Sequence, residues 1–302
     1  TRIEAFLDSL EGSEKNARKA VEVIRPRPSP SEPPSNRTLY FPYMHDGARF
    51  VAAAARSVGI PSEVLPMQTE EDIALGRKYT SSKECFPMIC TTGSFLKKLM
   101  EPGADPSKMS FFMPDHNGPC RFGQYNQFQR ILFDRLGFRD AELVTPSNDT
   151  SYADLAGDRS QRFRINAWKG FVAFDFIRKL YRETRPYELN PGESEAVYLD
   201  AMKKAEASIE KNCRGLRRIL VGASSAFMAV KVDKSKKKPV IAVLGEIFMR
   251  DNAGCNGNIA NRLEALGAEV LIGPFSEWIT YSTHRYTRDS RWKNDTKGVI
   301  RS

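Results

Sequence analysis

The feature that most restricts the fold of this chain is a repeated alternation along residues 37–146. A short run rich in aromatic or β-branched residues precedes an amphipathic segment, as where RTLYFPY is followed by DGARFVAAAARSVG and SKMSFFMP is followed at a distance by GQYNQFQRILFDRLG. Gly59 and Gly137 close the two helical segments, at the position where helices commonly end in a left-handed residue. With PSEVLP and AELVTP as further strands, this alternation predicts an α/β fold whose parallel sheet is covered on both faces.

The second half of the chain changes character and then returns to the same pattern. Residues 161–230 are predicted to form long helices, one of them including Cys213, and the lysine-rich run KVDKSKKKP reads as a linker. The strand KPVIAVLGEI, the helix NIANRLEALG and the strand AEVLIGP begin a second α/β unit. Two strands are too few for an independent sheet, so this unit is expected to be incomplete or to continue as helices after residue 273.

These patterns divide the chain into four predicted parts. They are an N-terminal helix with a proline-rich linker (1–36), a first α/β domain (37–160), a helical segment (161–230) and the start of a second α/β domain (239–302). Because the chain begins at Thr1 with no apolar leader, we expect no export signal, and either a trimmed or processed segment or one domain of a longer polypeptide.

Composition narrows the class of protein. The 302 residues carry a net charge of +9, but the basic side chains are scattered and form no stripe interleaved with aromatics, which argues against nucleic-acid binding. The charge leaves room for attraction of an anionic cofactor such as a coenzyme A ester. No run approaches the ~20 apolar residues of a membrane helix. An odd count of five cysteines argues against a disulfide framework and for a reducing, cytoplasmic location.

Three of the five cysteines stand where a strand gives way to a helix. Cys120 lies between the predicted strand at 108–114 and the helix that starts near Gly123, Cys255 lies at the equivalent place in the second unit, and Cys85 precedes the helix FPMICTTGSFLKKL. Ligands of open α/β sheets bind at such ends, and helix N-termini favour the thiolate that binds metal. By contrast, Cys213 is interpreted as packing, and Cys90, one helical turn inside, as a core residue.

The residues around these cysteines allow more than one reading. Four neighbouring glycines would let the backbone approach a cluster and donate N–H groups to its sulfurs, although glycines in turns often serve only a positive φ: Gly118, Gly123, Gly254 and Gly257. Further polar neighbours at these turns, each equally explained as a helix-start surface residue, are Arg121, Gln124 and Asn256. Glu246 and Arg250, just past the strand of the second unit, could face the cleft. Arg250 and Asp251 are expected to form a local ion pair.

Two other chemistries remain open from spacing alone. Cys85, Cys90, His116 and Cys120 have spacings compatible with a zinc site. A Cys120–His116 nucleophile is also conceivable, although no third orienting group is evident. There is no C-x-x-C pair and no ferredoxin run.

Four stretches resemble the activase-associated branch of the 2-hydroxyacyl-CoA dehydratase and benzoyl-CoA reductase superfamily. They lie between about residues 38 and 275: KECFPMICTTGSFLK, FFMPDHNGPCRFGQYNQF, AWKGFVAFDFIRKLYRETRPYE and GEIFMRDNAGCNGNIANRLEALGAEV. The GPCRFGQY block is the specific one, whereas NRLEALGAEV is a general βα pattern.

The resemblance implies flavodoxin-like α/β domains with a helical insertion and an iron–sulfur cluster, of [4Fe-4S] or double-cubane type, between them. Its protein ligands would be Cys85, Cys120 and Cys255. A partner ATPase, the activase, would deliver electrons at low potential, and the substrate would be an acyl-CoA or another small molecule. The chain would then be the acceptor component of a reductase or 2-hydroxyacyl-CoA dehydratase, acting as a dimer. The alternative is a non-catalytic zinc- or cluster-binding module of a larger protein.

Overall fold

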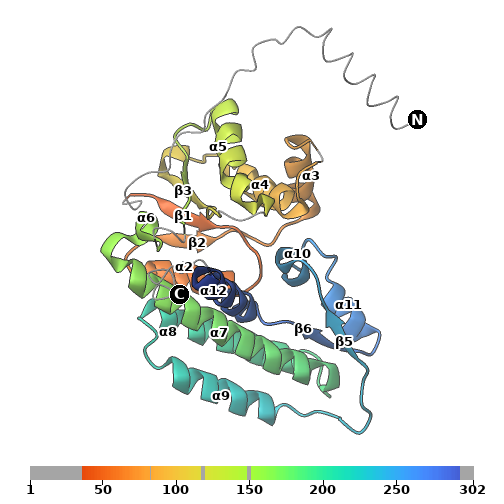
Figure 1. The fold of residues 1–302 in the computed structure, drawn as a ribbon. Helices are drawn as coiled ribbons and strands as arrows, with labels where there is room; N and C mark the ends of the chain where they lie inside the picture. The colour runs from red at the N-terminus through yellow and green to blue at the C-terminus, as the bar shows by residue number, and fades with distance from the viewer. Residues whose placement is uncertain (1–35, 82, 117–119, 148–150, 293–302) are drawn as a thin grey trace, which may run out of the picture.

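The computed structural model describes residues 36–81, 83–116, 120–147 and 151–292. The predicted N-terminal helix and most of the linker after it lie outside the described residues. The first part of the described chain is built on four parallel strands in the order β2-β1-β3-β4 (Figure 1). The strands are β1 (Thr38–Phe41), β2 (Ser62–Val64), β3 (Met109–Phe112) and β4 (Glu142–Val144). The expected flavodoxin-like α/β fold is therefore present.

Alternating side chains of the central strands supply two separate cores. Leu39 and Phe41 of β1 are buried against one set of helices, whereas Phe111 of β3 is buried on the opposite face. The first face is covered by α2 (Ala48–Arg56), α7 (Ser160–Thr184) and α8 (Glu193–Glu210). The second face is covered by α4 (Phe86–Leu99) and α5 (Tyr125–Arg135). This two-sided cover is what the short apolar strands predicted.

Three helices end at glycines, two of which, Gly59 and Gly137, were predicted to close them. Gly59, Gly137 and Gly267 all have positive φ, at 84°, 85° and 96°. A helix that the sequence analysis did not assign, α3 (Glu70–Lys78), lies between β2 and α4. It begins at Thr69, where the Thr69 side chain and the carboxylate of Asp72 form a reciprocal capping box.

The helical part differs from the sequence prediction at Cys213. The predicted continuous helix through Cys213 is two helices, α8 and α9 (Leu216–Ala229), separated by a turn in which Asn212, Cys213 and Gly215 have positive φ. Cys213 is nevertheless half-buried against the first core, and its Sγ lies 3.4 Å from Oδ1 of Asn166 on α7. A short helix, α6 (Ala153–Ala156), precedes α7.

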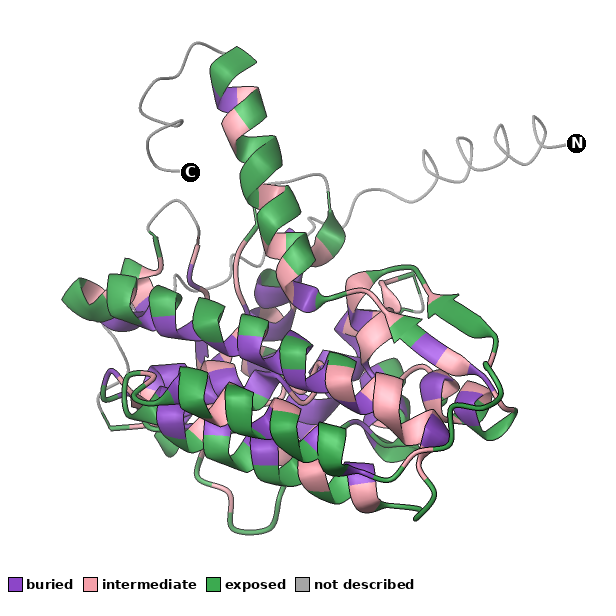
Figure 2. Ribbon diagram, turned by 90° about the horizontal axis from the view of Figure 1, so that it is seen from below, coloured by how far each residue is buried: buried purple, intermediate pink, exposed green. Residues whose placement is uncertain are grey.

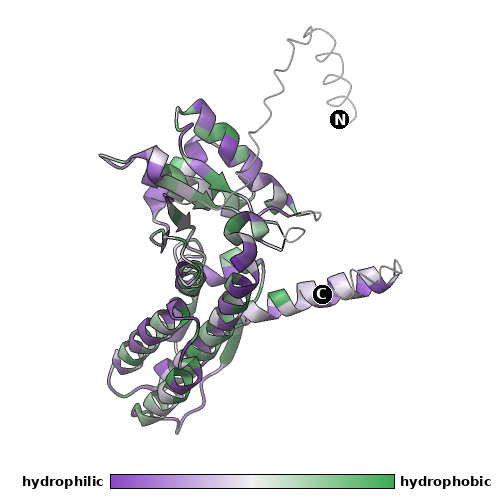
Figure 3. Cartoon of the chain, turned by 90° about the vertical axis from the view of Figure 1, so that its left-hand side faces the viewer, coloured by the Kyte–Doolittle hydropathy of each residue, from purple (hydrophilic) through white to green (hydrophobic). Residues whose placement is uncertain are grey.

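The last part of the described chain returns to βα structure. Strands β5 (Val240–Val243) and β6 (Glu269–Ile272) pair in parallel as a separate two-stranded sheet, connected through α10 (Ile247–Asp251) and α11 (Ile259–Ala265). The polar stretch after residue 273 is largely helical: α12 (Phe275–Trp292) projects from the body and is mostly exposed (Figures 2 and 3). Among the described helices, none combines the length and apolar character that spanning a bilayer requires.

Candidate functional site

The predicted site cysteines gather at the carboxyl end of the four-stranded sheet. The strand order reverses between β1 and β3, and in such sheets the crevice at the reversal is the usual ligand site. The segment after β3 leads to Cys120, and the segment after β1 contains Met44 and His45. Because α4 runs back toward the start of β3, its N-terminus with Cys85 lies at the same end of the sheet.

Cys85 is placed by the packing of α3 on α4. It is the residue immediately before α4, has extended backbone, and its carbonyl accepts hydrogen bonds from the N–H groups of Met88 (3.0 Å) and Ile89 (3.3 Å). The two helices cross at Gly76 and Gly93, where an added Cβ would come 2.0 Å from the carbonyl oxygen of Ile89 and 1.8 Å from that of Asp72. Only glycine permits this backbone contact, so the crossing fixes where α4 begins.

Cys120 occupies the equivalent position before a 3-10 turn, Arg121–Gln124, that runs into α5. Its side chain is exposed. Gly123 in this turn does not have positive φ; instead, a Cβ there would lie 2.1 Å from the carbonyl oxygen of His116. Arg121 donates from Nη1 to the carbonyl of Lys83 at 2.7 Å. The Cys120 turn is therefore tied to the segment just before Cys85.

Tyr125 joins these two cysteines and was not assigned a role from the sequence. Burial raises the pKa of its hydroxyl, as do a hydrogen bond to Cys85 and the nearby Cys120 and Glu246, so it remains a protonated donor. Glu246 precedes α10 and its carboxylate accepts hydrogen bonds from the N–H groups of Phe248 and Met249. The Tyr125 hydroxyl thus lies among groups from α4, the Cys120 turn and α10. The only hint in the sequence was its place in the GPCRFGQY block.

Cys255 lies against Cys90 rather than in a group of three thiols. It stands between α10 and α11, four residues before α11 begins, and its Sγ is 3.1 Å from Sγ of Cys90 on α4. Cys90 is fully buried, as expected of a core residue, while Cys255 is partly exposed. The hydrogen bond to Cys255 and burial together raise the pKa of the Cys90 thiol. Met44, Phe86 and Phe248 are among the apolar neighbours of this pair.

A buried amide fixes the loop that carries Cys255. The fully buried Asn252 donates from Nδ2 to Oε1 of Gln68 (2.7 Å) and to the carbonyl of Tyr43 (3.2 Å), and its Oδ1 accepts from the N–H of Cys255 (3.0 Å). At Gly254, which has no positive φ, a Cβ would lie 2.3 Å from the carbonyl oxygen of Gln68. Contacts with the loops after β1 and β2 therefore fix the position of Cys255 beside α4.

The remaining predicted neighbours have mostly structural roles. Asn256 donates from Nδ2 to the carbonyl of Met249 at 2.9 Å and accepts from the N–H of Ile259, which stabilises its own turn. Gly257 has φ of 67°. Gly118 lies outside the described residues. Gln124 directly precedes α5, where its side chain forms no capping hydrogen bond. His116 is exposed and its ring is 6.3 Å from that of Phe122.

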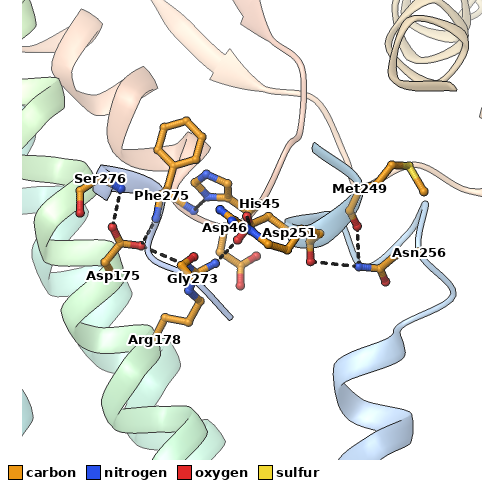
Figure 4. Close-up of polar contacts among 12 residues, drawn as sticks. His45, Asp46, Asp175, Arg178, Met249, Asp251, Asn256, Gly273, Phe275 and Ser276 are labelled. Atoms are coloured by element: carbon orange, nitrogen blue, oxygen red, sulfur yellow. Dashed lines mark hydrogen bonds and ion pairs between the residues drawn. The ribbon is translucent and has the colours of Figure 1, made fainter. Parts of the chain in front are cut away.

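A buried charge network is centred on Arg178 (Figure 4). Arg178 on α7 pairs with Asp251 of α10 and, at 3.0 Å, with Asp175, and it donates to the carbonyl of Gly273 at 3.1 Å. Asp175 also accepts from the N–H groups of Phe275 and Ser276, the start of α12. Asp251 receives the expected local ion pair from Arg250 at 3.1 Å. The network joins the segment that follows β5 to the helices under the first sheet.

His45 is buried close to this charge network. It is fully buried, its ring stacks on Phe174 with centroids 4.5 Å apart, and its Nδ1 accepts from the N–H of Gly47. Burial, with a smaller contribution from Arg178, lowers the pKa of His45 to about 3. The imidazole is therefore neutral at physiological pH and acts as a packed ring.

The thiols at this end of the sheet match an iron–sulfur cluster in part. Thiols of Cys85 and Cys120, each at the start of a helical segment and close to a hydroxyl donor, are the ligand chemistry such a cluster takes. In the part of the chain that the structure describes, however, no three His, Cys, Asp or Glu side chains are arranged to hold one metal ion. Cys85 and Cys120 fit the group in kind, whereas Cys255 contacts Cys90.

Comparison with known proteins adds no assignment: no family model, curated protein or solved structure matches this chain.

Proposed function

We propose that this chain is the iron–sulfur cluster-bearing acceptor component of an ATP-dependent, low-potential reductase or dehydratase system. The observation that supports it is the meeting of Cys85 and Cys120 around the Tyr125 hydroxyl at the strand-order reversal of a flavodoxin-like sheet. Core packing does not explain Cys120, because its side chain is exposed, whereas Cys85 also packs against the second core.

Each residue has a definite role in this proposal. Cys85 and Cys120 would hold the cluster from α4 and the α5 turn, and Cys255 from the α10–α11 loop; the bound cluster supplies one-electron transfer. Tyr125 donates a hydrogen bond to the sulfur of Cys85, which stabilises negative charge there. Arg121 keeps the two thiol-bearing segments together through the carbonyl of Lys83.

The partners follow from the same proposal. In the superfamily that the chain resembles, a partner ATPase delivers electrons at low potential, so the proposed partner is an activase ATPase, and the proposed substrate is an acyl-CoA or another small molecule. The proposal includes a dimeric assembly, as in the dehydratases it resembles.

Anaerobic purification tests the proposal directly. We expect a brown protein with absorption from iron–sulfide charge transfer, with iron and acid-labile sulfide in equal amounts. Cys120→Ala should lose this absorption, because it removes an exposed thiol with no packing role, while the matched control Cys213→Ala in the α8–α9 turn should keep it. A colourless protein that cannot be reconstituted, or colour that survives Cys120→Ala, would contradict the proposal.

A further inference from the structure

We propose that Cys90 and Cys255 form a redox-active dithiol that exchanges with small disulfides of the glutathione class. The two sulfurs lie 3.1 Å apart although the residues are 165 positions apart in the chain. A disulfide bond is about 2.05 Å long, so the sulfurs need to approach by only about 1 Å.

The fold holds the sulfurs of Cys90 and Cys255 close to each other. Asn252 and Gly254 fix the Cys255 loop on the carbonyls of Tyr43 and Gln68, and Cys90 is fixed within α4, whose crossing with α3 leaves no room for displacement toward α3. The apolar neighbours Phe86 and Phe248 surround the pair. Two thiols held this way form an intramolecular bond faster than two mobile ones.

The difference in exposure assigns the order of events. Cys255 is partly exposed and Cys90 is fully buried, so the attack on an external disulfide has to come from Cys255. The Cys255 thiolate attacks one sulfur of the small disulfide, forms a mixed disulfide and releases one thiolate. Cys90 then attacks the Cys255 sulfur, its proton leaves, and the second small thiolate is released. The chain loses two electrons and two protons, and the small disulfide becomes two thiols.

The bond would link α4 to the loop between α10 and α11. Its consequence for the metal site rests on the proposed function: an oxidised Cys255 cannot be a thiolate ligand, so the disulfide form would lack one of the three proposed ligands while Cys85 and Cys120 stay free.

The test uses the full chain with Cys85, Cys120 and Cys213 changed to Ser, which leaves only the proposed pair. After treatment with oxidised glutathione and alkylation, we expect free thiols to fall from two to none, with a mass loss of two hydrogen atoms and no glutathione adduct. Because three of the cysteines are gone, this result does not depend on any cluster, so its failure is distinct from failure of the proposed function.

Two further variants on this background test the order. With Cys90→Ser, a glutathione adduct should remain on Cys255, since nothing resolves it. With Cys255→Ser, the buried Cys90 should stay unmodified in the folded protein. A stable adduct on Cys255 while Cys90 is present, or modification of Cys90 without Cys255, would overturn the proposal.

The wild-type chain provides a test that does not depend on the folding of the variants. Trypsin should release Cys90 within residues 84–97 and Cys255 within residues 251–262. After oxidation these peptides should be joined, and fragmentation should place the bond at Cys90 rather than Cys85. A bond to Cys85, or no joined peptides, would count against the dithiol.

Discussion

The sharpest prediction compares one substitution at two helical glycines. Gly93 lies within α4 at the α3 crossing, where an alanine Cβ would be 1.8 Å from the carbonyl oxygen of Asp72. Gly222 lies within α9 and is exposed, with nothing within 4 Å of a Cβ. Both sites are helical, so both gain about 1 kcal/mol in helix propensity from alanine. They differ only in the space around the new methyl group.

The magnitude follows from that space. A carbon and a carbonyl oxygen need roughly 3.4 Å, close to the usual range of non-bonded contacts, so α3 would have to withdraw by about 1.5 Å. Backbone cannot rotate away as a side chain can, and such overpacking costs up to about 3 kcal/mol. After the propensity gain, Gly93→Ala should lower the free energy of unfolding by roughly 2 kcal/mol. Gly222→Ala should raise it by about 1 kcal/mol.

Urea unfolding followed by circular dichroism measures both changes, with unchanged m-values as a check on two-state behaviour. The reasoning also predicts that Gly93→Ala perturbs Cys85, because the crossing fixes the start of α4. If Gly93→Ala proved as stable as Gly222→Ala, the close α3–α4 contact would be refuted.

Two further predictions concern the buried network. Arg178→Met should lower the free energy of unfolding by about 3 kcal/mol. This is the lower end for a broken buried pair, because Asp251 keeps its ion pair with Arg250 and Asp175 keeps two N–H donors. The control Lys204→Met, whose ion pair with Asp200 is exposed, should change the free energy of unfolding by at most ~0.5 kcal/mol, and equal effects of the two substitutions would contradict the prediction. The pKa of His45 is lowered to about 3 by burial, so the unfolded chain binds a proton that the folded chain does not, and stability falls as the pH drops below about 6.5. From pH 7 to pH 5 this linkage removes about 2 kcal/mol, measurable by urea unfolding at each pH; His45→Gln should flatten that slope, and an unchanged slope would argue against a neutral buried imidazole.

Local features of the fold were readable from the sequence because they depend on neighbouring residues. The alternation of strands and helices predicted a covered parallel sheet, and Gly59 and Gly137 end helices with the positive φ that glycine adopts freely. Cys85 and Cys120 were placed at helix starts for the same reason: the Pro at the second position of α4 and the glycines around Cys120 are local signals. These were the parts of the candidate site that the sequence predicted.

Where the prediction from the sequence was wrong or incomplete, a contact between residues far apart in the chain determined the local structure. The helix through Cys213 looked continuous from its periodicity, but it breaks so that α9 can fold back and pack on α8 and α7. The stretch after residue 273 was expected either to be cut short or to continue as helices; it is a helix, and its first N–H groups are capped by Asp175, 100 residues earlier. Local propensity could not reveal a capping residue on another element.

The sequence by itself therefore determined the fold class, the helix ends at Gly59 and Gly137, and the cysteines that begin helices. Only the tertiary structure decided which thiols meet: Cys90 was expected in the core and Cys255 at a ligand site, and folding brings their sulfurs within 3.1 Å across 165 positions. It also decided that Gly76, Gly93, Gly123 and Gly254 serve close backbone contacts rather than positive φ. Helix starts and turns depend on a few adjacent residues, whereas such contacts depend on how whole elements pack against one another.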